Sequence, residues 1–294
     1  MKIFILGGNG MIGHKIYQAL HKKFDDTWIL VRQHLKDLTY KEVFNGAKAI
    51  QSVDLLHFDR LTGILDNLDP DIIINAAGIT IRRGVDSNIC NSIIMNSALP
   101  HFLEEWVTGK GGKRLIHFST DCVFSGKRGA YKEDSIPDAM DYYGKTKALG
   151  EVKGSQTLTL RSSMIGRELA NHTELLEWFL LQKGNTVQGF KNVIYSGITT
   201  VKMAEYITKI ITDFPSMSGL YNVSSVPISK YELLKLFNKN FDVDADILIK
   251  EDYYSRKDLI ADKFFDETGF AIPEWEDLAV QLKKDSLLYS KYYK

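Results

Sequence analysis

The chain has 294 residues, with 37 Lys and Arg against 37 Asp and Glu, so its formal net charge is zero. This balance argues against nucleic acid or an anionic membrane as the main partner, because both favour a basic protein surface. The hydrophobic fraction of 44% is ordinary for a globular protein, and the length predicts one large domain or two coupled ones.

Cysteine usage and hydropathy favour a cytoplasmic protein. Cys90 and Cys122 are the only cysteines, too few for a disulfide framework. The N-terminal apolar run is too short for a signal peptide, and no apolar run approaches the roughly 18 residues that a membrane span needs. The seven histidines show no paired metal-ligand spacing, so we expect no metal site.

The N-terminus has the pattern of a dinucleotide-binding turn. Residues 2–6 predict a buried strand, a glycine turn follows, and Ile12, Ile16 and Leu20 predict an amphipathic helix. The three glycines of such a motif allow a tight turn, a close approach of the pyrophosphate, and packing of the helix on its strand. The phosphates then lie at the helix N-terminus. The expected cofactor contacts in this stretch are Gly7, Asn9, Gly10, Met11, Ile12 and Gly13.

The end of the second expected strand, 27–31, bears on the identity of the cofactor. A site that prefers NAD usually has Asp or Glu near this point, whereas an arginine suits a 2′-phosphate. Arg32, with Lys36 close by, therefore favours NADP(H) over NAD(H). The alternative is that Arg32 is a solvated loop residue.

Two further strands are expected before residue 80. Residues 49–53 predict a third strand that ends in Asp54 and Leu55, and Asp59 is the expected N-cap of a helix through Leu68. Residues 71–78 form an apolar run of the kind found in parallel sheets covered on both faces. It ends in Ala76, Ala77 and Gly78, whose small side chains allow a flat cofactor to approach.

The next segments predict a catalytic group. A helix at 88–107 leads to a strand at 114–118, which delivers Thr120 to the carboxyl edge of the sheet, where open parallel sheets bind ligands. Tyr143 and Lys147 are four residues apart, so a helix places both on one face. We expect the Lys147 ammonium to lower the Tyr143 pKa from its free value of about 10 toward the working range. Such a pair also occurs by chance on exposed helices.

The C-terminal half predicts an interleaved second part. After a strand at 157–162 the expected elements are helices at 172–182, 199–211 and 231–237, strands at 219–223 and 242–249, a helix that ends near Thr268, and a helix from Glu274. We predict an α/β fold: a Rossmann-type, doubly wound parallel sheet with a smaller C-terminal lobe. The NADP-binding domain is expected at 1–163 plus about 193–224, and the substrate-binding lobe at about 164–192 plus 225–294, with the active cleft between them.

Four motifs resemble those of extended short-chain dehydrogenases/reductases, most closely the dTDP-4-dehydrorhamnose reductase group. They lie at 7–13, 75–78, 119–126 and 143–151, and the resemblance covers nearly the whole chain. It implies NADPH-dependent reduction of the C4 keto group of a nucleotide-linked 4-keto-6-deoxy sugar, for cell-surface polysaccharide synthesis. The substrate would be dTDP-4-dehydrorhamnose or a UDP-linked 4-keto-6-deoxy-N-acetyl sugar.

The resemblance also assigns roles. Tyr143 would protonate the C4 oxygen while NADPH delivers hydride, Lys147 would lower the tyrosine pKa and hold the nicotinamide ribose, and Thr120 would orient the carbonyl. Asp121 would lie at the sugar site or order its loop, and Arg167 would meet the diphosphate or be a surface residue. Cys122 would be a wall of the substrate site. The remaining cofactor contacts would be Asp54, Leu55, Ala76, Ala77 and Gly78.

Three other functions are weighed against this one. A 4,6-dehydratase would carry glutamate at position 122, and an epimerase typically uses NAD. A non-catalytic NADP-binding regulatory subunit, as known for a methionine adenosyltransferase partner, is opposed by the intact Thr120, Tyr143 and Lys147. The usual residue of the reductases at position 122 is tyrosine, so Cys122 leaves the sugar nucleotide open. Tail tyrosines point to a contact surface and thus to a homodimer: Tyr289, Tyr292 and Tyr293.

Overall fold

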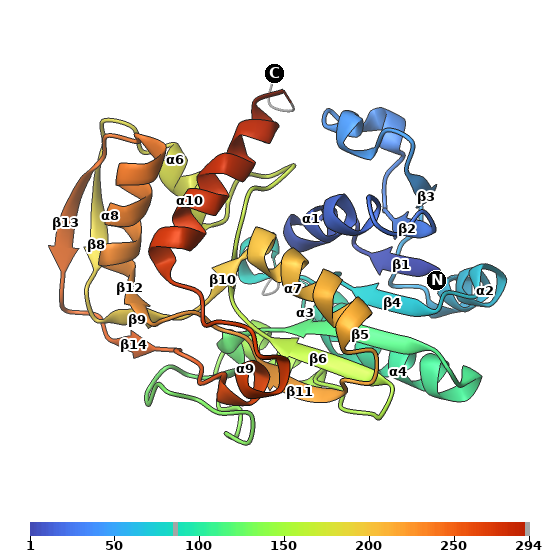
Figure 1. The fold of residues 1–294 in the computed structure, drawn as a ribbon. Helices are drawn as coiled ribbons and strands as arrows, with labels where there is room; N and C mark the ends of the chain where they lie inside the picture. The colour runs from blue at the N-terminus through green and yellow to red at the C-terminus, as the bar shows by residue number, and fades with distance from the viewer. Residues whose placement is uncertain (85–87, 292–294) are drawn as a thin grey trace.

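A seven-stranded parallel sheet forms the centre of the computed structural model, which describes residues 1–84 and 88–291 (Figure 1). Every adjacent pair of strands in it is parallel, which confirms the predicted Rossmann-type sheet. In spatial order the strands are β11 (Gly219–Asn222), β6 (Thr157–Arg161), β5 (Arg114–Ser119), β4 (Ile72–Asn75), β1 (Ile3–Leu6), β2 (Thr27–Leu30) and β3 (Lys48–Ile50).

Both faces of this sheet are buried. In β1 the side chains alternate, so Ile3 and Ile5 join one core while Phe4 and Leu6 join the other. Helices α1 (Met11–Leu20) and α7 (Thr200–Asp213) cover the first face, and α2 (Phe58–Leu68) and α4 (Leu99–Lys110) cover the second. Covering on both faces is the reason why the central strands read as unbroken apolar runs.

The strand order reverses between β1 and β4. Strand β1 pairs with β2 on one side and with β4 on the other. Helix α1, which follows β1, covers one face of the sheet, whereas α4, which follows β4, covers the opposite face. Ligands of doubly wound sheets bind in the crevice at this switch point. The sequence places the glycine turn after β1 and residues 76–78 after β4, so both predicted cofactor segments lie at this crevice.

Several elements differ from their predicted bounds. The helix predicted at 88–107 consists of α3 (Ile89–Ile93), a π-helical turn η4 (Ile94–Ala98) and α4. Asp59 is not the N-cap of α2, because the helix begins at Phe58; the carboxylate lies in the first turn, where it still complements the helix dipole. The third strand, β3, has three residues, fewer than the five predicted at 49–53.

The sheet domain also contains three short 3₁₀ turns, η1 (Leu35–Asp37), η2 (Lys41–Phe44) and η3 (Ile81–Arg83).

A smaller group of elements lies beside the sheet, with its own core between α6 (Leu175–Leu180), α8 (Lys230–Phe241) and α10 (Trp275–Ser286) (Figure 1). Its strand near residue 245 begins later than predicted, because Asp242 and Asp244 have left-handed φ values of 53° and 57°. The helix predicted at 172–182 is also shorter. The elements are β7 (Met164–Ile165), α6, β8 (Thr186–Phe190), β9 (Val193–Tyr195), β10 (Ile198–Thr199), β12 (Ile228–Ser229), α8, β13 (Asp246–Lys250), β14 (Ser255–Arg256) and α10. Helix α9 (Asp262–Thr268) instead packs on the sheet domain, where Phe264 and Phe265 join its core.

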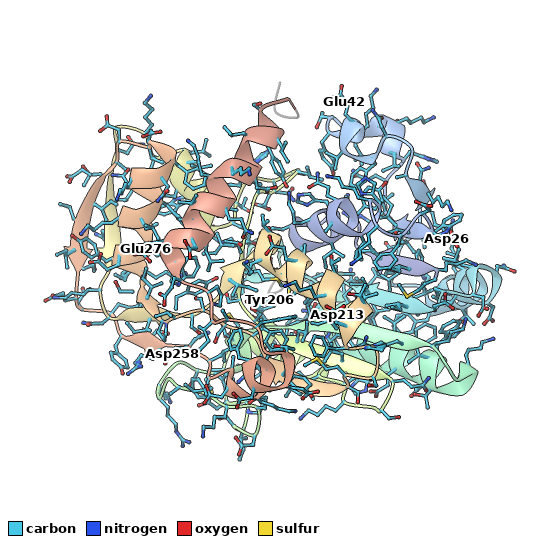
Figure 2. All side chains as sticks on the ribbon, viewed as in Figure 1. Asp26, Glu42, Tyr206, Asp213, Asp258 and Glu276 are labelled. Carbon is cyan, nitrogen blue, oxygen red and sulfur yellow. The ribbon has the colours of Figure 1, made fainter. Side chains whose placement is uncertain are left out.

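Aromatic contacts join the last part of the chain to the sheet domain. Tyr206 on α7, near the centre of Figure 2, stacks on Phe270 with ring centroids 5.0 Å apart. Tyr289 is fully buried inside the chain, which corrects its assignment to a subunit contact surface; Tyr292 and Tyr293 lie outside the described residues. No helix among residues 1–84 and 88–291 is long and apolar enough to cross a membrane.

Candidate active site

Helix α5 (Tyr142–Leu149) places Tyr143 and Lys147 in one cavity. The helix begins where the Asp141 side chain accepts a hydrogen bond from the Gly144 amide at 2.8 Å, which fixes its first turn. Tyr143, Lys147 and Thr120 all line a cavity of about 310 Å³ beyond the carboxyl ends of β4 and β5. The structure therefore brings together the three residues predicted to be catalytic.

The electrostatics of this pair differ from the prediction. Burial raises the pKa of Tyr143, and the Thr120 hydroxyl, within hydrogen-bonding reach, only partly offsets this rise. Lys147 is also buried; burial lowers its pKa to about 8, and its Nζ donates to the Phe118 carbonyl at 2.6 Å. The expected lowering of the tyrosine pKa by Lys147 is thus not observed. Burial instead keeps Tyr143 a neutral phenol that carries a proton to donate.

The turn after β5 is ordered by its own side chains. Thr120 Oγ1 accepts from the Cys122 amide at 3.2 Å and donates to Asp121 Oδ1 at 3.1 Å, which caps η5 (Asp121–Val123). Asp121 is buried and is not among the cavity-lining residues, so its contacts favour the loop-ordering alternative. Cys122 lines the cavity, and burial raises the pKa of its thiol to about 12, as suits a wall and not a nucleophile.

A buried ion pair supports the same strand ends. Glu151 accepts from Ser119 Oγ at 2.6 Å and pairs with Arg161 through two hydrogen bonds of 2.9 and 2.7 Å. Both side chains of the pair are almost fully buried. Removing one partner of such a pair leaves an uncompensated buried charge, which is strongly destabilising. Because Ser119 ends β5 and Arg161 ends β6, Glu151 holds the carboxyl ends of these two strands together.

A second cavity, of about 520 Å³, extends from the first along the glycine turn. The two share Gly10, Met11 and residues 76–78. Of the remaining predicted cofactor contacts, Ile12 lines the smaller cavity, and the following line the larger one: Gly7, Asn9, Arg32, Asp54 and Leu55. Residues in the lining that carried no sequence motif include Gln33, Tyr40, Leu56, Met95 and residues 168–171.

The glycine turn fits a dinucleotide. Gly7 has a φ of 73°, and a Cβ there would lie 3.0 Å from the Ala77 backbone. Gly13 lines neither cavity; a Cβ on it would overlap the Gly7 carbonyl, so it is the residue that allows α1 to pack against β1. Arg32 is exposed at the cavity edge, whereas Lys36 does not line it. Among residues 1–84 and 88–291, no three His, Cys, Asp or Glu side chains group as a metal site.

A third cavity, of about 540 Å³, adjoins the catalytic one on the lobe side, and the two share Arg82 and Glu174. Its walls carry the aromatic side chains of Trp178, Phe190, Tyr195 and Tyr253. The Lys230 ammonium lies 4.0 Å from the Tyr195 ring centroid, and burial lowers its pKa to about 8. No sequence motif predicted this cavity, because its residues come from distant segments.

Arg167 does not lie where either alternative placed it. Its Nε is 2.6 Å from Glu177 Oε1, its guanidinium lies 5.3 Å from the Tyr289 ring centroid, and its side chain is only 11% exposed. It lines none of the three cavities. Arg167 is therefore mostly buried and paired with Glu177, neither exposed on the surface nor part of the lining of these three cavities.

Three known proteins are similar to this chain in sequence or in fold. A probable low-salt glycan biosynthesis reductase from Haloferax volcanii is 26% identical over 235 residues, which cover 76% of this chain and 75% of that protein. A dTDP-4-dehydrorhamnose reductase from Aggregatibacter actinomycetemcomitans is 28% identical over 191 residues, 61% of this chain and 64% of that protein. A solved structure of a dTDP-4-dehydrorhamnose reductase from Bacillus anthracis in complex with NADP shares the fold, with a TM-score of 0.77, 18% identity and coverage of 97% and 99% of the two chains.

Residues 1–249 match the family described as the RmlD substrate binding domain. This match spans most of the chain and contains all four motifs on which the resemblance to extended short-chain dehydrogenases/reductases rests. The chain belongs to the RmlD substrate binding domain family.

Proposed function

We propose that this protein is an NADPH-dependent reductase of the C4 keto group of a nucleotide-linked 4-keto-6-deoxy sugar, in cell-surface polysaccharide synthesis. The observation that carries the proposal is the convergence of Thr120, Tyr143 and Lys147 on one cavity, which is continuous with the glycine-turn cavity and adjoins the aromatic one. Family membership and the reductases among its relatives support the same reaction.

The glycine turn and its surroundings would hold NADP(H), which supplies the hydride when bound. The backbone amides at the start of α1 are the anion-binding groups of the turn. Arg32 would pair with the 2′-phosphate, Asp54 and Leu55 would flank the adenine, and residues 76–78 would lie along the cofactor. The cavity edge at Arg32 carries no carboxylate from the loop after β2, which supports NADP(H) over NAD(H).

Reduction of a ketone adds hydride to carbon and a proton to oxygen, and Tyr143 supplies the proton. Burial would keep its phenol protonated until a substrate carbonyl oxygen accepts that proton. The Thr120 hydroxyl, which donates to Asp121 in this structure, would turn to donate to the same carbonyl oxygen. The phenolate that remains is a buried anion. Lys147, on the same face of α5 and with its pKa of about 8, is the cation that would stabilise it and hold the nicotinamide ribose.

The aromatic cavity would take the nucleotide of the substrate. Trp178 and Tyr253 offer rings for stacking with a base, and Lys230 and Arg82 offer cations for a diphosphate. The sugar would then lie at the junction with the catalytic cavity, against Cys122. A thymine and a uracil base have the same hydrogen-bonding edge, so the dTDP- and UDP-linked substrates both remain candidates.

The proposal includes a division of the chain into a cofactor domain and a substrate lobe. Residues 1–163 plus about 193–224 would form the cofactor domain, and about 164–192 plus 225–294 the substrate lobe; the place of β11 in the main sheet and the pairing of β8 with β13 support this division. We place the protein in the cytoplasm, supported by its two free cysteines. The homodimer stays a prediction that size-exclusion chromatography tests, now without support from Tyr289.

The proposal is tested by offering purified protein NADPH with dTDP- and UDP-linked 4-keto-6-deoxy sugars in parallel. We expect rapid NADPH consumption with one of them, which also identifies the nucleotide. An epimerase would interconvert sugars without net consumption of NADPH. A non-catalytic regulatory subunit would bind NADPH and consume none with either substrate, and that result would contradict the proposal.

A further inference from the structure

A buried hydrogen-bond chain connects the C-terminal turn of the protein to the glycine turn. After α10, the turn η6 (Leu287–Lys291) places the fully buried Tyr289 beside α1. The Tyr289 hydroxyl lies 2.5 Å from His14 Nε2, and His14 Nδ1 lies 2.7 Å from the Gly10 carbonyl oxygen. Gly10 is the N-cap of α1 and lines both the cofactor cavity and the catalytic cavity.

The hydrogen bond to the Gly10 carbonyl determines which atoms donate and which accept in this series. A carbonyl oxygen only accepts hydrogen bonds, so His14 Nδ1 must carry the proton. Burial and the neighbouring Lys15 lower the pKa of His14 to about 3, so the ring is neutral and Nε2 has a free lone pair. Nε2 therefore accepts from the Tyr289 hydroxyl. The Gly10 carbonyl thus sets the tautomer of His14, and the Tyr289 hydroxyl supplies the donor for the ring nitrogen that this tautomer leaves unprotonated.

A buried salt bridge also connects α1 to α10. Lys15 Nζ pairs with Asp285 Oδ1 at 2.7 Å, and the two side chains are only 5% and 10% exposed. The same ammonium lies 4.9 Å from the Tyr289 ring centroid. One turn of α1, directly after the glycine turn, is therefore held at two consecutive residues by the end of the chain.

The Tyr289 ring also contacts the lobe. The Arg167 guanidinium lies over this ring and pairs with Glu177, whose Oε1 also accepts from the Glu168 amide at 2.9 Å. Residues 168–171 line the same cofactor cavity as the glycine turn. Tyr289 is therefore linked through side-chain contacts to two segments of the lining of this cavity.

We propose that Tyr289 and Asp285 are positioning residues for the cofactor, which they never touch. The Gly10 carbonyl and the Met11 amide belong to one rigid peptide plane, so a bond that fixes Gly10 O also fixes the direction of the Met11 N–H. That amide is one of the donors expected to meet the cofactor phosphates. The inference rests on the NADP(H) site of the proposed function and adds that α10 and η6 contribute to its affinity.

The test is the dissociation constant of NADPH for the full-length Tyr289→Phe variant, measured by fluorescence titration without substrate. Loss of one buried hydrogen bond should raise this constant about fivefold. The KM for the sugar nucleotide and kcat at saturating NADPH should stay near the wild-type values. Asp285→Asn should act in the same direction. Leu288→Ala, in the same turn but 53% exposed, is the matched control and should leave the constant unchanged.

Thermal unfolding of the ligand-free variants separates positioning from mere structural support. A Tyr289→Phe protein that unfolds at a lower temperature yet binds NADPH as tightly as the wild type would overturn the proposal. Because the titration needs no turnover, its result is independent of the reductase assay. Absence of turnover in the wild type would count against the proposed reaction alone, whereas unchanged affinity in Tyr289→Phe would count against the positioning role alone.

Discussion

Arg32 is the single residue that most directly distinguishes NADP(H) from NAD(H). It is exposed at the edge of the cofactor cavity, where a 2′-phosphate would accept charge-assisted hydrogen bonds from its guanidinium. We expect Arg32→Ala to raise the KM for NADPH about tenfold and leave the KM for NADH nearly unchanged. Lys36→Ala is the control, since Lys36 lies outside the cavity lining. Equal effects on both cofactors would remove Arg32 from this role.

Lys147 gives a pH-dependent prediction for stability. Its pKa is about 8 in the folded protein and 10.5 in the unfolded chain, so below pH 8 the folded state carries the full cost of a buried charge. As the pH rises from 8 to 10.5, the folded state loses its proton first and this cost is relieved. The free energy of unfolding of wild type relative to Lys147→Met should therefore rise by about 2 kcal/mol between pH 7 and pH 10. Urea unfolding at both pH values measures it, and a constant difference would contradict the lowered pKa.

At the scale of elements, the contact between α1 and the glycine turn leaves no room for a side chain. A Cβ at Gly13 would overlap the Gly7 carbonyl, so Gly13→Ala must displace the helix or the turn. We expect this variant to lose NADPH binding and about 2 kcal/mol or more of stability. Gly63→Ala in α2 is the control, because nothing lies within 4 Å of its Cβ. The control should gain roughly 0.5–1 kcal/mol and bind NADPH normally; normal binding by Gly13→Ala would argue against the close packing.

The elements that the sequence predicted well are those with a strong local signal. The unbroken apolar runs of β1, β4 and β5 and the helix after the glycine turn all appear close to their expected positions. The π-helical turn η4 was missed because its cause is tertiary. Asn96 within it hydrogen-bonds to Ile79 and Thr146, two distant segments, and no local pattern announces such contacts.

At the scale of the whole molecule, some parts of the candidate site could be predicted from the sequence and others could not. The glycine turn, residues 76–78 and the Tyr143–Lys147 pair lie in contiguous motifs, so their place in one crevice could be predicted. The aromatic cavity and the His14–Tyr289 contact join residues up to 275 positions apart, which no contiguous motif can reveal. The raised pKa of Tyr143 has the same origin, because burial depends on all the elements packed around it.

Lys230 tests whether the lobe takes the nucleotide of the substrate. Lys230→Met removes the buried ammonium of the aromatic cavity while keeping most of its length, so the KM for the sugar nucleotide should rise about tenfold or more. The dissociation constant of NADPH should not change, because Lys230 does not line the cofactor cavity. Lys235→Met, exposed on the same helix, is the control. A rise in the NADPH constant instead would place the cofactor partly in the lobe.

The central claim is hydride transfer to C4 with proton donation by Tyr143, and isotope transfer tests it most directly. NADPH deuterated at both C4 positions of the nicotinamide is supplied with the keto sugar nucleotide that is turned over, and the product is examined by NMR. We predict one deuterium at C4 of the sugar with wild type, and no product with Tyr143→Phe, although this variant still binds NADPH. Deuterium at another sugar carbon, or undiminished transfer by Tyr143→Phe, would contradict the account.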